Sequence, residues 1–181
     1  LNGRLDLTAP DGKPIERVVI GERMDEWERC FDHAKHRQLA PQPCLDIRVL
    51  TPEDKVRCPE DHQILSIHAF GTPMDLEGGW TEAARSALEV AIVSSLEQYA
   101  PRVGGQIVGS RVLTPADLEQ DYGLAGGHLF HCEHAIDQLW MTRPTPTLAQ
   151  YKAPLEGLFL GSAASHPGGG VHGLCGLGAA N

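Results

Sequence analysis

The chain has 181 residues, of which 41% are hydrophobic and 22% charged, a composition typical of one soluble globular domain. Asp and Glu number 24 against 15 Lys and Arg, and the resulting net charge of −9, with no basic stripe in the sequence, argues against nucleic-acid binding. No apolar run approaches the ~20 residues that cross a bilayer, so we expect no transmembrane segment.

The five cysteines are scattered, and no two of them form a C-x-x-C pair. Such a set predicts unpaired, mostly buried thiols in a reducing compartment, and we expect a cytoplasmic location. The chain begins with Leu1 and ends in the small residues GLGAAN without a helix C-cap. We therefore expect it to be a piece of a longer protein.

The N-terminal half is predicted to contain strands and one amphipathic helix. Trp27, Cys30, Phe31 and Ala34 recur at helical spacing, which favours a helix from Met24 to about Lys35. Alternation and β-branched residues favour short strands elsewhere. These strands are expected over 4–7, 16–20, 44–50 and 63–70.

The C-terminal half is predicted to begin with the longest helix, over 81–99, and a strand over 105–113. Thr114 and Pro115 then favour a short helix, since proline suits the first helical position. The region 127–141 is ambiguous, and we expect a strand to about Phe130 and a helix or turn after it. A buried strand over 158–163 and a helix from about Gly169 complete the chain. The apolar stripe of the long helix is expected to be Ala84, Ala87, Leu88, Ala91 and Ile92.

These elements predict an α+β fold with a mixed or antiparallel sheet. The sheet is expected to contain 44–50, 63–70 and 105–113, with the 81–99 helix packed on it.

The sequence SHPGGGVHG, residues 165–173, is the first candidate site. Gly168, Gly169 and Gly170 carry no Cβ atoms, so a flat or anionic ligand can touch the main chain where the helix begins. The alternative is a glycine-rich turn that only packs against neighbouring elements.

A second candidate is the histidine-rich sequence after residue 127. His131 and His134 would share one face of a helix, and His128 and Cys132 lie close to them in sequence. The alternative, which we favour, is that these side chains line a substrate site or are buried and hydrogen-bonded, and we expect no metal site.

Two stretches resemble one enzyme family. APLEGLFLGSAASHPGGGVHGLCGLGAAN resembles the C-terminal flavin-binding signature of phytoene desaturase-like FAD oxidoreductases, within the wider amine oxidase group. GHLFHCEHAIDQLWMTRPTPTLAQYKAPLEGLFL is similar to the sequence that precedes this signature in the family. The resemblance is strongest over 123–181 and points to the branch described as pyridine nucleotide-disulfide oxidoreductase domain-containing.

The resemblance implies that residues 1–150 are a partial substrate-side domain. Residues 151–181 would then be the last strand, glycine turn and helix of the FAD-binding domain, and the N-terminal Rossmann motif is absent from this chain. When full length, such an enzyme would transfer a hydride from the carbon of a small, apolar substrate to flavin. The alternative is a cofactor-free α+β binding or interaction module. The oligomeric state stays open.

The resemblance also implies individual site residues. His131 and Glu133 are the candidate catalytic residues. We expect little or no FAD on this chain alone, and no activity, because the rest of the FAD site would be missing. The implied cofactor-binding residues are Gly161, Ser162, His166, Pro167, Gly168, Gly169, Gly170 and Val171.

Overall fold

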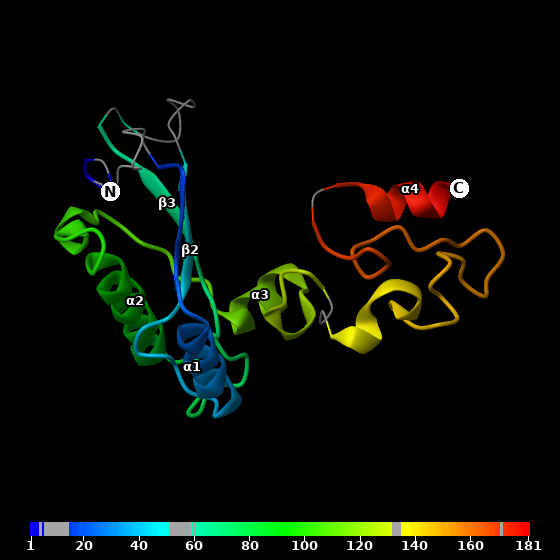
Figure 1. Cartoon of the computed structure of the whole chain (residues 1–181), viewed down its shortest axis with the longest axis horizontal. Helices are drawn as coiled ribbons and strands as arrows, with labels where there is room; N and C mark the ends of the chain where they lie inside the picture. The colour runs from blue at the N-terminus through cyan, green and yellow to red at the C-terminus, as the bar shows by residue number, and fades with distance from the viewer. Residues whose placement is uncertain (4, 6–14, 51–58, 60, 132–134, 171) are drawn as a thin grey trace. The chain divides into compact units, whose positions relative to one another are not determined.

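The chain forms two compact units, Leu1–Thr114 and Pro115–Asn181, each of which is described by itself (Figure 1). The predicted assignment of 151–181 to a FAD-binding domain stays a prediction. The computed structural model describes residues 1–3, 5, 15–50, 59, 61–131, 135–170 and 172–181. Most of the predicted strand at 4–7 lies outside these residues.

Three antiparallel strands form the sheet of the first unit. β1 (Arg17–Ile20) pairs with β2 (Leu45–Leu50), which pairs in turn with β3 (Ile64–Ala69). Leu45 lies opposite Ile20 on one side and opposite Ala69 on the other. The predictions of strands at 16–20, 44–50 and 63–70 are confirmed, and the antiparallel pairing agrees with the α+β class.

Alternation along β2 separates a core face from an open face. Leu45 and Ile47 are completely buried, whereas Arg48, which follows Ile47 and points to the other face, is exposed. α2 (Glu82–Glu97) lies beside the sheet, as Figure 1 shows, and Leu96 joins the same core cluster. Burial of a leucine of this kind contributes about 1.5–3 kcal/mol, so the packing of this helix on the sheet is a main source of stability.

The buried stripe of α2 differs from the predicted one. Leu88 and Leu96 are buried, but Ala87 is exposed. The helix begins as predicted after Thr81, whose side-chain oxygen accepts a hydrogen bond from the N–H of Ala84 at 3.2 Å. Ser95 is also buried, at 2% exposed, whereas Val90 is 67% exposed, so position around the helix and not side-chain size decides which residues are buried.

α1 (Met24–Lys35) has the predicted bounds and packs into a smaller, separate core. Its Trp27 ring meets the Phe70 ring edge to face, with centroids 4.8 Å apart. The buried members of this core are Cys30, Ala40 and Cys44.

The predicted strand at 105–113 is wrong. Val103–Gln106 form a 3-10 turn, and the residues that follow have no regular secondary structure. The N–H of Gly104 donates to the Glu97 carboxylate at 3.2 Å, and the Ser110 hydroxyl bonds to Glu89. Both acceptors belong to α2, so this segment follows the helix and does not meet the backbone partners that a strand requires.

The second unit consists of short helices and turns. α3 (Pro115–Tyr122) confirms the predicted short helix, and α4 (Leu174–Ala180) ends the chain. The described 3-10 turns between them are Ala125–Gly127, Ile136–Gln138 and Trp140–Thr142.

Two predicted strands and one helix start in this unit are wrong. Residues 127–130 form turns, and within 158–163 Phe159 makes an isolated bridge with Lys152. A strand needs a continuous ladder of partners, which the described residues do not supply here. α4 starts at Leu174, not near Gly169, because Gly170 and Gly173 have positive φ angles, +132° and +70°, that a right-handed helix cannot contain.

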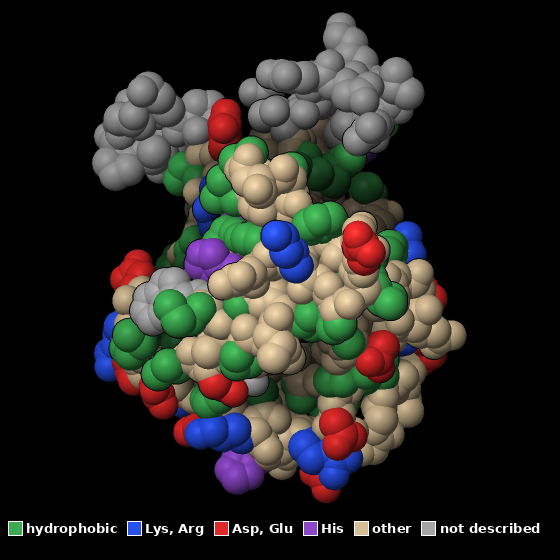
Figure 2. All heavy atoms as spheres, turned by 90° about the vertical axis from the view of Figure 1, so that its right-hand side faces the viewer, with side chains coloured by type: hydrophobic (Ala, Val, Ile, Leu, Met, Phe, Trp, Pro, Cys, Tyr) green, Lys and Arg blue, Asp and Glu red, His purple; other side chains and the backbone are tan. Residues whose placement is uncertain are grey.

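The second unit exposes many large apolar side chains. Figure 2 shows green apolar side chains interspersed with tan atoms and with scattered Lys, Arg, Asp and Glu side chains. Among the helices that the structure describes, none combines the length and the apolar character needed to span a membrane. The exposed apolar residues toward the C-terminus are Leu155, Leu158, Phe159, Leu174 and Leu177.

Candidate functional site

The glycine turn, which we define as residues 161–173, is built from tight backbone turns. The N–H of Ser165 donates to the Ser162 carbonyl at 2.9 Å, and the N–H of Gly168 donates to the Ser165 carbonyl at 2.8 Å. Gly168 and Gly170 have φ angles of +99° and +132°. Side-chain-bearing residues rarely adopt such angles, so the backbone itself favours glycine at both positions.

A buried arginine lies behind the turn. Arg143 is 1% exposed, and its Nη2 donates to the carbonyls of Ala163 at 3.0 Å and Phe130 at 3.3 Å. Its Nη1 donates to the Gln138 carbonyl at 3.4 Å. A Cβ atom added to Gly168 would lie 3.4 Å from the guanidinium carbon. The guanidinium therefore joins three separate segments and places a positive charge next to the glycines.

Three further side chains hold the backbone of the turn. The Ser165 hydroxyl donates to the Leu160 carbonyl at 3.1 Å, and the buried Cys175 thiol on α4 donates to the Ser165 carbonyl at 3.6 Å. The Tyr151 hydroxyl donates to the His166 carbonyl at 3.0 Å. These contacts tie the turn to the preceding loop and to α4, so its conformation is set before any ligand arrives.

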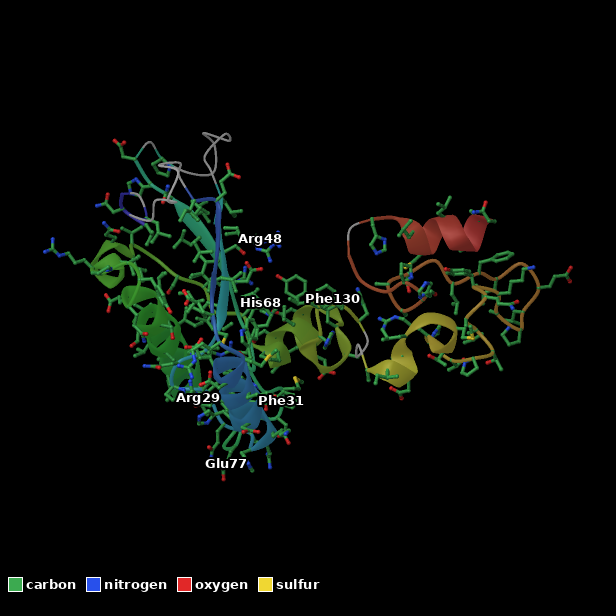
Figure 3. All side chains as sticks on the ribbon, in the orientation of Figure 1. Arg29, Phe31, Arg48, His68, Glu77 and Phe130 are labelled. Atoms are coloured by element: carbon green, nitrogen blue, oxygen red, sulfur yellow. The ribbon has the colours of Figure 1, made fainter. Side chains whose placement is uncertain are left out.

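Close packing accounts for two other glycines. A Cβ atom on Gly169 would lie 2.5 Å from Cδ1 of Phe130, a residue labelled in Figure 3, and one on Gly178 would overlap the Tyr151 ring. Part of the bare backbone is therefore required by the fold itself, as the packing alternative predicts.

Two adjacent main-chain N–H groups remain available on the turn. Among the described residues, the N–H groups of Gly169 and Gly170 donate to no partner. Gly170 is exposed and Gly169 partly so. Successive backbone N–H groups without partners can bind an anion or the negative edge of a ligand.

The structure brings the described members of the predicted cofactor-binding set together on this one turn. Val171 lies outside the described residues, and the role of the others in binding a cofactor stays a prediction. The described members are Gly161, Ser162, His166, Pro167, Gly168, Gly169 and Gly170.

The histidine-rich sequence is described only in part. The N–H of His131 donates to the His128 carbonyl at 3.0 Å, and both residues are exposed. Cys132, Glu133 and His134 lie outside the described residues, so the catalytic pair of His131 with Glu133 stays a prediction. In the part of the chain that the structure describes, no three His, Cys, Asp or Glu side chains are grouped so as to hold a metal ion.

A second polar group lies on the open face of the sheet in the first unit. Arg17 donates to both carboxylate oxygens of Asp46, at 2.7 and 2.9 Å, and this pairing lowers the pKa of Asp46. His68 stands opposite Asp46 in the register, and partial burial lowers its pKa from the usual value. Figure 3 shows His68 and Arg48 on the side of the sheet away from α2.

Sequence reasoning missed the side chains that hold the glycine turn in place. An arginine in a proline-rich loop looks like a solvated residue, because such a loop has no periodicity that reveals burial. The pairing of that arginine with the following proline, inside the stretch that resembles the family, is the signal that could have found it. The missed residues are Arg143 and Tyr151; Ser165 lies in the predicted candidate stretch and Cys175 is one of the thiols predicted to be mostly buried, but their contacts with the turn were not predicted.

Comparison with known proteins gives a consistent family. The chain is 34% identical over 155 residues to pyridine nucleotide-disulfide oxidoreductase domain-containing protein 2 of Rattus norvegicus, which covers 84% of this chain and 27% of the rat protein. The Mus musculus protein of the same name is 32% identical. This chain is homologous to part of these larger proteins. A phytoene desaturase (lycopene-forming) from Pseudescherichia vulneris is 26% identical over 88% of this chain and 29% of that protein.

The family resemblance predicted from the sequence is thereby confirmed. The matched region spans 27–29% of the length of these relatives. No family model matches it. The names of the relatives are those of oxidoreductases and, at greater distance, of a desaturase, whereas the cofactor and the site residues of this chain stay predictions.

Proposed function

We propose that this chain is part of an FAD-dependent oxidoreductase that transfers a hydride from a carbon of a small, apolar substrate to flavin. Homology to proteins named as oxidoreductases supports the reaction class. The observation that carries the proposal is the pair of main-chain N–H groups of Gly169 and Gly170, which have no partner among the described residues. We assign these two groups to the edge of the flavin ring.

The turn suits such a ligand for two physical reasons. Gly170 is exposed and carries no Cβ atom, so a flat ring can approach the backbone there, whereas the Cβ positions of Gly168 and Gly169 face Arg143 and Phe130. The buried charge of Arg143 lies behind Gly168 and favours negative charge at the turn. Bound FAD would supply a two-electron acceptor, and the chain's own groups would orient its ring and stabilise the negative charge that builds up on reduction.

The 181-residue chain alone is expected to bind little or no FAD. The dinucleotide pyrophosphate and ribose groups are held by a Rossmann motif in enzymes of this kind, and the sequence here contains none. Without those contacts, the turn cannot offset the ~4–15 kcal/mol cost of association. The purified chain should be colourless, and a stoichiometric flavin spectrum would contradict this division of the binding site.

The proposal is tested on the full protein that the gene encodes, by the flavin-to-protein ratio and the flavin reduction potential. Gly170→Val should lower the ratio or shift the potential, because its φ of +132° disfavours any side chain and its N–H faces the proposed ring. Gly176→Ala on α4 is the matched control, since an added Cβ there meets no atom within 4 Å.

Circular dichroism separates loss of flavin from loss of fold in these variants. A full protein that holds no flavin would overturn the proposal and favour the cofactor-free interaction module. A Gly170→Val protein that binds and reduces flavin like its parent would show that the glycines serve packing alone.

A further inference from the structure

Two cysteines of the first unit, which the proposed function does not use, lie side by side. Cys30 is on α1 and Cys44 directly precedes β2, and their Sγ atoms are 3.6 Å apart. Each residue is 2% exposed, and neither is in a disulfide. A disulfide has an S–S distance of about 2.0 Å, so the two sulfurs need to approach by only about 1.6 Å.

A cavity of about 170 Å³ gives access to this pair. α1, the segment 40–44 and the end of α2 contribute its walls, which include both cysteines. One water needs roughly 10–15 Å³ of such space, so a molecule as small as hydrogen peroxide can enter. The slight exposure of the thiols excludes bulky disulfide reagents. The polar side chains around the cavity include Glu26, Arg29, His33 and Gln98.

The surroundings of the two sulfurs give them different roles. Burial, assisted by the hydrogen bond with Cys30, raises the pKa of the Cys44 thiol to about 12. Cys44 therefore stays protonated at neutral pH. The Cys30 sulfur accepts the backbone N–H of Cys44 at 3.3 Å, and its own thiol donates to the Gln42 carbonyl at 3.6 Å. Because Cys44 stays protonated, we assign the first attack on peroxide to Cys30 and the resolving step to Cys44, whose sulfur lies 3.6 Å away.

We propose that Cys30 and Cys44 form an intramolecular disulfide when hydrogen peroxide enters this cavity. The Cys30 sulfur attacks one peroxide oxygen, the O–O bond breaks, and Cys30 sulfenic acid and one water form. The Cys44 sulfur then displaces the hydroxyl group, which leaves with the Cys44 thiol proton as a second water. The two sulfurs lose two electrons in total, and the two peroxide oxygens gain them. The new bond ties α1 covalently to the start of β2.

The test is carried out on the 181-residue chain and does not depend on flavin. The reduced protein is treated with a stoichiometric amount of hydrogen peroxide, alkylated, and digested without reductant for mass spectrometry. We expect two of the five thiols to be lost, the protein to lose the mass of two hydrogen atoms, and a peptide that joins Cys30 to Cys44. The same treatment in denaturing urea should abolish the preference for this pair.

Variants assign the order of events. Cys44→Ser should stop at Cys30 sulfenic acid, which dimedone captures, whereas Cys175→Ser should cross-link like the parent. Cys175 is a suitable control because it is also buried, but its thiol contacts the backbone carbonyls of Ser165 and Gly168. If the Cys44→Ser protein does not fold, the peptide map of the unmutated chain still shows whether Cys30 and Cys44 become cross-linked. Alkylation of both Cys30 and Cys44 after peroxide treatment, or cross-linking as unselective as in urea, would overturn the proposal.

Discussion

Arg143→Met should destabilise the second unit strongly. The guanidinium is 1% exposed and donates to the carbonyls of three residues, Phe130, Gln138 and Ala163, at 3.0–3.4 Å. Methionine keeps an unbranched stem but leaves these carbonyls without this donor. A hydrogen bond from a charged donor is worth about 1.5–3 kcal/mol, and an orphaned buried acceptor costs ~1–3 kcal/mol. Because such losses are not additive, we expect the free energy of unfolding to fall by about 3–5 kcal/mol.

Native-state hydrogen exchange of peptides from 158–181 measures this loss locally. A change of about 3–5 kcal/mol corresponds to exchange that is roughly 10²–10⁴-fold faster, up to the limit set by the total stability of the unit. Peptides from β2 and α2 should keep their protection, because they belong to the first unit. Lys152→Met is the matched control, since it removes a positive charge from an exposed position of the same unit.

Arg143→Lys separates charge from geometry. Lysine keeps the charge but lacks the planar fork that reaches carbonyls on several sides, so most of the loss should persist. If the amide hydrogens of 158–181 exchange at the same rate in the Arg143→Met and Lys152→Met proteins, the hydrogen bonds of the arginine do not hold the glycine turn. The claim that the turn is arranged before ligand binding would then fail.

Three further changes test the packing and the charges. Leu96→Ala should cost about 2–5 kcal/mol in urea denaturation, and a loss below about 1 kcal/mol would contradict its place in the sheet core. Gly169→Ala should lower the thermal midpoint in calorimetry, since its Cβ would meet Phe130, whereas an unchanged midpoint would show that Phe130 moves aside freely. Burial lowers the pKa of His68, so the unfolded chain binds more protons below about pH 6.5 and the free energy of unfolding rises with pH through that window. His68→Gln should flatten this rise in urea titrations across pH, and an equal slope in both proteins would refute it.

The elements of the first unit that bury one face were determined by the sequence alone. The helix predicted from Met24 to about Lys35 has those bounds. The strand predicted at 44–50 begins one residue later, and the strand predicted at 63–70 is one residue shorter at each end. Spacing along the chain decides which side chains share a face, and burial of that face supplies the stability. Such elements can therefore be predicted without knowledge of their partners.

Strands that depend on a partner could not be predicted in this way. The stretches 105–113 and 158–163 have the composition of strands, yet neither meets a continuous backbone ladder in the described residues. A strand is stable only when another segment supplies its hydrogen bonds, and that supply depends on how distant parts of the chain come together.

For the glycine turn as well, some features follow from the sequence and others only from the tertiary structure. The sequence by itself determined that residues 168–170 present a bare backbone, because three consecutive glycines carry no Cβ atoms. The tertiary structure decided that Phe130 covers Gly169 and that Arg143 is buried behind Gly168. The acceptors of that arginine lie 5, 13 and 20 residues away along the chain. Only the folded unit brings these carbonyls together. Their hydrogen bonds to the guanidinium offset the free-energy cost of burying its charge.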